Sequence, residues 1–170
     1  MNIFYLSSNP ATAAMYHCDK HCVKMILETA QLLSSAHHAF DSRWVDSVYK
    51  KTHFNHPSSI WVRSSRDHYD WAYNLFLDLC HEYSERYDKT HKSELMRPFL
   101  GVNPVTIRKG FTQPPQCMPD EYKHPNSVIA YRKYYAGEKA HFAKWKNGNV
   151  PAWFTLLTTV NTNQMEANYA

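Results

Sequence analysis

The stretch MYHCDKHCVKMILETAQLLSSA, Met15–Ala36, carries the clearest helical pattern in the chain. Wound as an α-helix at about 100° per residue, it brings a set of polar side chains onto one stripe and leaves most of the remaining surface apolar. The stripe consists of His17, His21, Lys24, Glu28 and Gln31. Because a helix that is apolar around most of its circumference is typical of a buried position, we expect this helix to be central.

Polar side chains on a buried helix need partners, or a cleft that holds water or a ligand, since each unpaired buried group costs several kcal/mol. The stripe is therefore predicted to form the wall of a functional site. The alternative is an ordinary solvated face of an amphipathic helix, because Lys20 and Ser34 lie near one border of the stripe.

The helical patterns predict an all-α protein, and the length predicts a single domain spanning residues 1–170. A chain of 170 residues with 44% hydrophobic residues can bury one core, and only four glycines argue against many tight turns. The net charge of +4 permits a polyanionic partner without requiring one. Four cysteines with no CxxC pair and no signal peptide suggest the reducing cytoplasm. No apolar run is long enough to cross a membrane.

The chain opens with an apolar segment, residues 1–8, in which NIFYL has the composition of one short strand. Asn9 followed by Pro10 is a typical helix start, so the first helix is predicted from there to about His38.

A second helix is predicted from Ile60 to about Tyr87, capped by Ser58 or Ser59. Its apolar stripe is bordered by Glu82 and Arg86, an i,i+4 pair of opposite charge. The pair is either a weak surface interaction or a support that holds a site residue in place.

Residues 96–126 are predicted to form a long Pro-rich loop packed over the helices, because six prolines exclude a long helix while many apolar residues argue against disorder. Thr106, Arg108 and Lys109 beside Phe111 form a basic and aromatic group. Further along, Asp120 and Glu121 are either supporting carboxylates of a site or the start of a turn after Pro119.

The last clear helix is predicted from Ser127 to about Lys146, and a frayed tail from Asn161 to residue 170. One face of this helix is aromatic and includes Tyr135. A basic border follows it, made by Arg132, Lys139 and Lys146. Such a face suits a groove that follows phosphates and stacks bases, or equally a core face rimmed by long cationic side chains.

Three chemistries can be drawn from these residues. His17 and His21, at i,i+4 spacing, could bind a metal ion if a third ligand came from elsewhere; the candidates are Glu28, Glu82, Asp120 and His91. Cys18 or Cys22 could act as a nucleophile, but both lie on the apolar flank and are interpreted as core thiols. An amine, either Lys24 or the α-amine of Met1, could attack a sugar carbon while Glu28 stabilises the cationic intermediate. An α-amine suits this role because its ordinary pKa near 8 leaves part of it unprotonated at neutral pH.

The order of these parts resembles the small all-helical pyrimidine-dimer DNA glycosylases of the phage endonuclease V type. The shared features are the opening MNIFYL, an early helix with Glu28, the N-H-P step Asn55–Pro57, and a basic aromatic C-terminal helix ending in P-A-W, Pro151–Trp153. The segments HCDKH, MPDEYK and AGEKAHFAKWK resemble phage-encoded proteins of unassigned activity more closely.

The resemblance implies an enzyme that flips a damaged or modified base out of DNA, opens the sugar through an imine at C1′ and nicks the strand by β-elimination. Glu28 matches the essential helix glutamate of that family. The family's nucleophile is the amine of a small residue exposed by methionine removal. Asn2 is a poor signal for that removal, so here the amine would belong to Met1.

We therefore expect a DNA glycosylase/AP lyase of phage type, working on DNA in the cytoplasm without a cofactor. The expected catalytic residues are Met1, His17, His21, Lys24 and Glu28; the DNA contacts are Arg108, Lys109, Arg132, Tyr135, Lys139 and Lys146; the supporting residues are Gln31, Glu82, Arg86, Asp120 and Glu121. The alternatives are a metal-dependent or base-modifying enzyme acting on DNA or nucleotides at a wall of His17, His21 and Glu28, and a non-enzymatic helical binding protein such as a host-directed inhibitor. The oligomeric state stays open.

Overall fold

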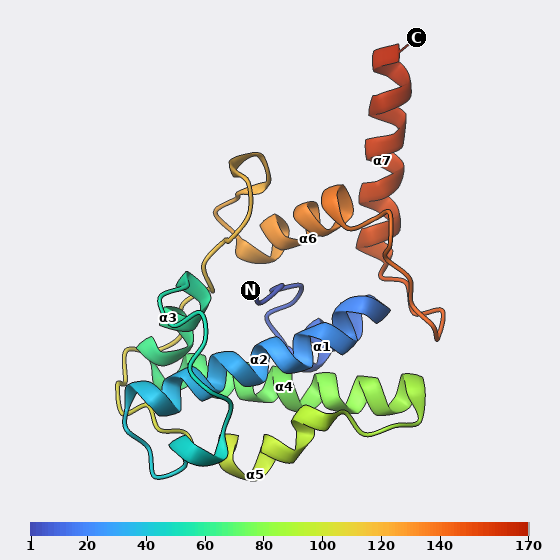
Figure 1. Cartoon of the computed structure of the whole chain (residues 1–170). Helices are drawn as coiled ribbons and strands as arrows, with labels where there is room; N and C mark the ends of the chain where they lie inside the picture. Colours follow the sequence, from blue (N-terminus) through green and yellow to red (C-terminus); the bar gives the residue numbers. More distant parts are fainter. Residues whose placement is uncertain (170) are drawn as a thin grey trace.

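The protein is all-α, as predicted. In the computed structural model, which describes the backbone of residues 1–169 and the side chains of residues 1–160, every regular element is helical (Figure 1). The α-helices are α1 (Pro10–Tyr16), α2 (Asp19–Ala39), α3 (Pro57–Ser64), α4 (Arg66–Tyr87), α5 (Arg97–Leu100), α6 (Ser127–Glu138) and α7 (Ala152–Tyr169). Short 3-10 turns lie at Val45–Ser47, Lys92–Met96 and Asp120–Tyr122.

Helices α2 and α4 lie side by side and form the centre of the molecule (Figure 1). The side of α2 that faces inward buries Met25, Ile26 and Leu33 completely. On α4, the predicted stripe is in the core, with Phe76 and Leu79 fully buried. Burial of each such side chain contributes about 1.5–3 kcal/mol, so this pair of helices is a main source of stability.

The first predicted helix starts where expected but is interrupted. Asn9 caps α1, accepting a hydrogen bond from the Thr12 amide at 2.9 Å, and Pro10 is the first helical residue. The prediction of one helix as far as His38 is wrong, because His17 and Cys18 are extended, with ψ of 128° and 165°. We call these two residues the α1–α2 joint.

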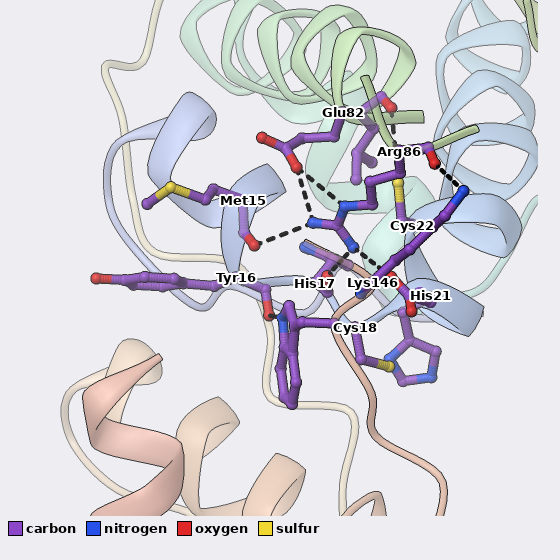
Figure 2. A network of polar contacts seen from close by, with 12 residues as sticks. Met15, Tyr16, His17, Cys18, His21, Cys22, Glu82, Arg86 and Lys146 are labelled. Carbon is purple, nitrogen blue, oxygen red and sulfur yellow. Dashed lines mark hydrogen bonds and ion pairs between the residues drawn. The ribbon is translucent and has the colours of Figure 1, made fainter. Parts of the chain in front are cut away.

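The α1–α2 joint is held by Arg86 of α4, whose side chain is only 3% exposed. Its Nη1 donates to the carbonyl of His17 at 2.8 Å and to Asp19 Oδ1 at 3.2 Å, and its Nη2 donates to the carbonyl of Met15 at 3.1 Å and to Glu82 Oε2 at 2.8 Å (Figure 2). Arg86 therefore binds carbonyls that the end of α1 leaves unpaired, and its charge is compensated by two carboxylates.

The second predicted helix is also divided. His56, and not Ser58 or Ser59, caps α3, because its Nδ1 accepts from the Ser58 amide at 3.2 Å. Helix α3 stops at Ser65, which is extended with φ of −152°, and α4 begins at Arg66, whose amide donates to the carbonyl of Ile107 at 2.7 Å. The Pro-rich loop therefore provides the hydrogen bond that replaces helical pairing at this break.

The C-terminal part differs most from the prediction. Asn126 caps α6 as its sequence suggests, but α6 ends at Glu138 and not near Lys146. Helix α7 then projects away from the other helices (Figure 1). It runs as far as Tyr169, and the side chains of the predicted tail lie outside the described part of the chain.

The N-terminal arm, residues 1–8, contains no strand and lies between α2 and α6 (Figure 1). The Pro-rich loop packs against the core through Leu100 and Val105, which are fully buried. Its residue Thr112 is bound to two side chains, since its carbonyl accepts from Trp61 Nε1 at 3.0 Å and its amide donates to His68 Nε2 at 2.8 Å.

Replacing Arg86 with leucine should lower the free energy of unfolding by about 3 kcal/mol or more, because two carboxylates and two carbonyls would lose a buried partner. Arg66→Leu is the matched control on the same helix. Its ion pair with Asp70 is about half exposed, so it should change stability by less than about 0.5 kcal/mol. Urea denaturation measures both, and equal effects would contradict a special role for Arg86.

Candidate functional site

The polar stripe of α2 opens into a pocket of about 340 Å³ between the N-terminal arm, α2 and α6. We call it the N-terminal pocket. It is lined by Met1, Asn2, Phe4, His21, Lys24, Glu28, His56, Cys117, Tyr134 and Lys139. The predicted site residues Met1, His21, Lys24, Glu28 and Lys139 therefore share one cavity.

Asn2 fixes the position of the N-terminal arm in this pocket. Its Nδ2 donates to the carbonyl of Cys117 at 3.0 Å, and its Oδ1 accepts from the hydroxyl of Tyr131 at 2.6 Å. Its backbone amide donates to Glu28 Oε2 at 3.4 Å. Met1 directly precedes this amide, so the hydrogen bond keeps Met1 next to Glu28.

Phe4 folds the arm against α2 in an unfavourable backbone conformation. Its φ is 49°, in the left-handed region that costs a non-glycine residue about 1–2 kcal/mol. Its ring stacks on His21, with centroids 4.4 Å apart, and meets Tyr135 edge to face at 5.5 Å. These contacts offset the strain and keep Phe4 in the pocket wall.

Each carboxylate oxygen of Glu28 contacts a different nitrogen. Its Oε1 is 3.2 Å from Lys24 Nζ, one turn earlier on α2, and its Oε2 accepts from the Asn2 amide. The side chain of Glu28 is 15% exposed and that of Lys24 is 66% exposed. The carboxylate is therefore largely enclosed, while the ammonium group reaches out to solvent.

His21 is held by Tyr135 of α6. The hydroxyl of Tyr135 accepts from the Cys18 amide at 2.9 Å and lies 2.8 Å from His21 Nδ1. Burial lowers the pKa of His21 to about 3, with the nearby His17, Lys139 and Lys24 adding to the effect. The imidazole is consequently neutral at physiological pH.

His56 reaches the same pocket from the start of α3. Burial lowers its pKa, the α-amine and His53 lower it further, and Glu28 opposes them. Since its Nδ1 accepts from the Ser58 amide, the proton of the neutral ring is on Nε2. His56 is a site residue that the analysis of charge and spacing missed, although the N-H-P step marked its position.

His17, a predicted catalytic residue, lies outside the pocket. The interruption of the helix puts it in the joint, where it is 0% exposed and its Nδ1 donates to the carbonyl of Ala13 at 2.7 Å. Burial lowers its pKa to about 4. Gln31 also does not line the pocket. Glu82 and Arg86 hold the joint and not a pocket residue directly.

Most of the predicted DNA contacts have partners inside the protein. Tyr135 is fully buried, so it cannot stack on a base. Arg132 Nε donates to the carbonyl of Leu6 at 2.9 Å, and Lys146 Nζ donates to the carbonyl of Arg86 at 2.6 Å. Lys139 lines the pocket, 4.8 Å from the centre of the Tyr134 ring.

The remaining candidates lie on the Pro-rich loop outside the pocket. Arg108 and Lys109 are exposed and remain available to phosphates. Asp120 and Glu121 are exposed in the 3-10 turn after Pro119, where Asp120 pairs with Lys123 at 2.6 Å. The turn interpretation of these two carboxylates therefore accounts for them.

Within residues 1–160, no three His, Cys, Asp or Glu side chains are grouped so that they could hold a metal ion. His17 and His21 face different surroundings, the joint and the pocket. No helix of the described chain is both long and apolar enough to cross a membrane. Comparisons with protein-family models, curated protein sequences and solved structures find no match to this chain.

The buried neutral histidines predict acid sensitivity. The pKa values of His17, His21 and His37 are lowered to about 4, 3 and 4 in the folded protein, from an ordinary value near 6.5. Below pH 6.5 the unfolded chain therefore binds more protons than the folded one. Each histidine should lower the free energy of unfolding by up to about 1.4 kcal/mol per pH unit, down to its folded-state pKa.

Urea denaturation at pH 7, 6 and 5 measures this slope. His17→Gln should make it shallower, while the matched control His81→Gln, at an exposed position on α4, should leave it unchanged. A stability that is flat between pH 7 and 5 would contradict the burial of these imidazoles in neutral form.

Proposed function

We propose that this protein is a DNA glycosylase/AP lyase whose nucleophile is the α-amine of Met1 and whose essential carboxylate is Glu28. The observation that supports this proposal is that both residues line one pocket of about 340 Å³, with the Asn2 amide 3.4 Å from Glu28 Oε2. This volume is at the small end of the usual range for small-molecule sites and suits a single extrahelical sugar.

In the proposed reaction, the unprotonated amine attacks C1′ of the deoxyribose, and the base leaves with the electron pair of the glycosidic bond and a proton. Opening of the C1′–O4′ bond gives a cationic imine, which Glu28 stabilises. Loss of the C2′ proton and then of the 3′-phosphate nicks the strand, and water hydrolyses the imine to release the amine. Under this proposal Glu28 takes and returns the protons, and its contact with the Asn2 amide keeps it beside the arm.

The positive groups of the pocket favour a nucleic-acid substrate. The α-amine, Lys24 and Lys139 face it, against the single carboxylate of Glu28. Exposed Arg108 and Lys109 extend the positive charge onto the loop. These groups would contribute salt-dependent contacts to phosphates.

The resemblance to the phage endonuclease V type, carried by MNIFYL, Glu28 and the N-H-P step, leads to the same proposal. We further propose that the protein is phage-encoded and acts in the host cytosol, where its four free cysteines stay reduced.

Borohydride reduction tests the imine directly. Incubation with a duplex that contains an abasic site, or a thymine dimer, should give a covalent protein–DNA adduct on a denaturing gel. Glu28→Gln should reduce adduct formation by about 100-fold or more, whereas the exposed control Glu121→Gln should not. Absence of an adduct on the abasic duplex, where no base has to be removed, would overturn the proposal in favour of a binding protein.

Adding Gly-Ser before Met1 should abolish the adduct, because the new α-amine would be displaced from Glu28 and the old one would become an amide. The matched control carries the same two residues after Ala170 and should react like the unmodified protein. Intact mass spectrometry establishes which residue is N-terminal. An N-terminally extended protein that reacts at the normal rate would contradict the role of Met1 and point to Lys24.

A further inference from the structure

Among the charged groups that line the N-terminal pocket, hydrogen-bond donors outnumber acceptors. Lys24 and Lys139 are cationic donors, the α-amine is a donor whether or not it is protonated, and Glu28 is the one carboxylate among the lining residues. Both oxygens of Glu28 are already bound, one by Lys24 and one by the Asn2 amide. A ligand therefore meets a surface that offers protons and positive charge and has little free acceptor capacity.

The tautomer of His21 follows from its hydrogen bonds. The backbone amide of Cys18 can only donate, so the hydroxyl of Tyr135 accepts from it. Tyr135 is fully buried, and the strong acceptor for its own proton is His21 Nδ1, at 2.8 Å, since the Cys18 thiol beside the hydroxyl is a weak acceptor. His21 Nδ1 thus accepts, and the ring proton is on Nε2. In the described part of the chain the hydrogen bond of His21 runs through Nδ1, to Tyr135, and leaves Nε2 available, while the ring lines the pocket.

His56 reaches the same state by a different route. Its Nδ1 accepts from the Ser58 amide as the cap of α3, which leaves the proton on Nε2. The lowered pKa values of both rings keep them neutral at pH 7. Two neutral imidazoles, one on α2 and one at the cap of α3, therefore line one pocket together with Met1, Lys24 and Lys139, and each carries its proton on Nε2.

We propose that the N-terminal pocket binds phosphate oxygens of a nucleotide, with His21 and His56 acting as fixed Nε2–H donors and not as bases. Phosphate fits because it offers several acceptors and negative charge but no obligatory donor. Neutral N–H donors add direction without adding further charge. This inference rests on the proposed function only in taking the nucleotide to be part of DNA; a free nucleotide has the same chemistry.

The tautomers are measurable without any ligand. Long-range ¹H–¹⁵N spectra of the histidine rings should show His21 as a neutral Nε2–H form from pH 6 to 8, and His56 in the same form at pH 8. Tyr135→Phe should release His21 from this single form, since it removes the donor to Nδ1. A normal titration of His21 near pH 6.5, or an Nδ1–H form of either ring, would overturn the proposal.

Binding is tested with inorganic phosphate, thymidine 5′-monophosphate and a duplex carrying a tetrahydrofuran abasic analogue, which cannot form an imine. His56→Asn keeps a good cap for α3 but removes the Nε2–H, and His21→Phe keeps the ring that stacks on Phe4. Each should weaken binding about tenfold, and the exposed control His53→Asn should not. Thermal melting confirms that the variants are folded.

The outcomes separate this inference from the proposed function. Binding that depends on His21 and His56, without a borohydride adduct, would keep the phosphate site and overturn the lyase. If the His21 and His56 variants form the adduct and bind DNA as well as the unmodified protein does, the phosphate site would be overturned and the lyase kept. Tighter binding of the duplex than of the mononucleotide identifies DNA as the source of the phosphate, and the reverse identifies a free nucleotide.

Discussion

The arrangement of the protein depends on the buried guanidinium of Arg86. It takes up carbonyls of Met15 and His17 that the end of α1 leaves unpaired, and it also pairs with Asp19 in the first turn of α2. A helix that ends inside a protein must have such partners, because an unpaired buried carbonyl costs about 1–3 kcal/mol. Because Arg86 supplies these partners, α1 can end at Tyr16 and α2 can begin at Asp19, with only two residues between them. The restart at Asp19 directs His21, Lys24 and Glu28 toward the pocket while His17 stays behind in the joint.

A helix start or break can be predicted from the sequence when the residue that stabilises it is close by in the chain, and not when that residue is far away. Helix starts at Asn9 and Asn126 were predictable because the capping side chain is next to the helix that it caps. The convergence of Lys24 and Glu28 was predictable because both lie on one helix at i,i+4. The break at His17 was not, since it is stabilised by Arg86, about 70 residues later in the chain. The same holds for Ser65, where the replacement partner is Ile107.

The cationic border of the last predicted helix shows why charge patterns alone do not identify a DNA surface. Arg132 and Lys146 have the spacing of a phosphate-binding ridge, yet both donate to backbone carbonyls, of Leu6 and Arg86. The side chain of Arg132 binds the N-terminal arm, and that of Lys146 binds the backbone of α4 at Arg86. Lys139, at the same spacing, lines the pocket instead. Periodicity could not separate these roles because all three residues satisfy it equally.

In the proposed mechanism, the position of the Met1 amine depends on the side chain of Asn2. Its side chain has both a donor and an acceptor, and these bind the Pro-rich loop at Cys117 and α6 at Tyr131. A smaller second residue would favour methionine removal but could not make these two bonds, so its amine would be free to move. With asparagine, the arm is held by both bonds. Under the proposed mechanism the amine is thus positioned by the side chain of its neighbour. The rest of the arm is held against α2 by the stacking of Phe4 on His21, and this contact offsets the strained backbone of Phe4.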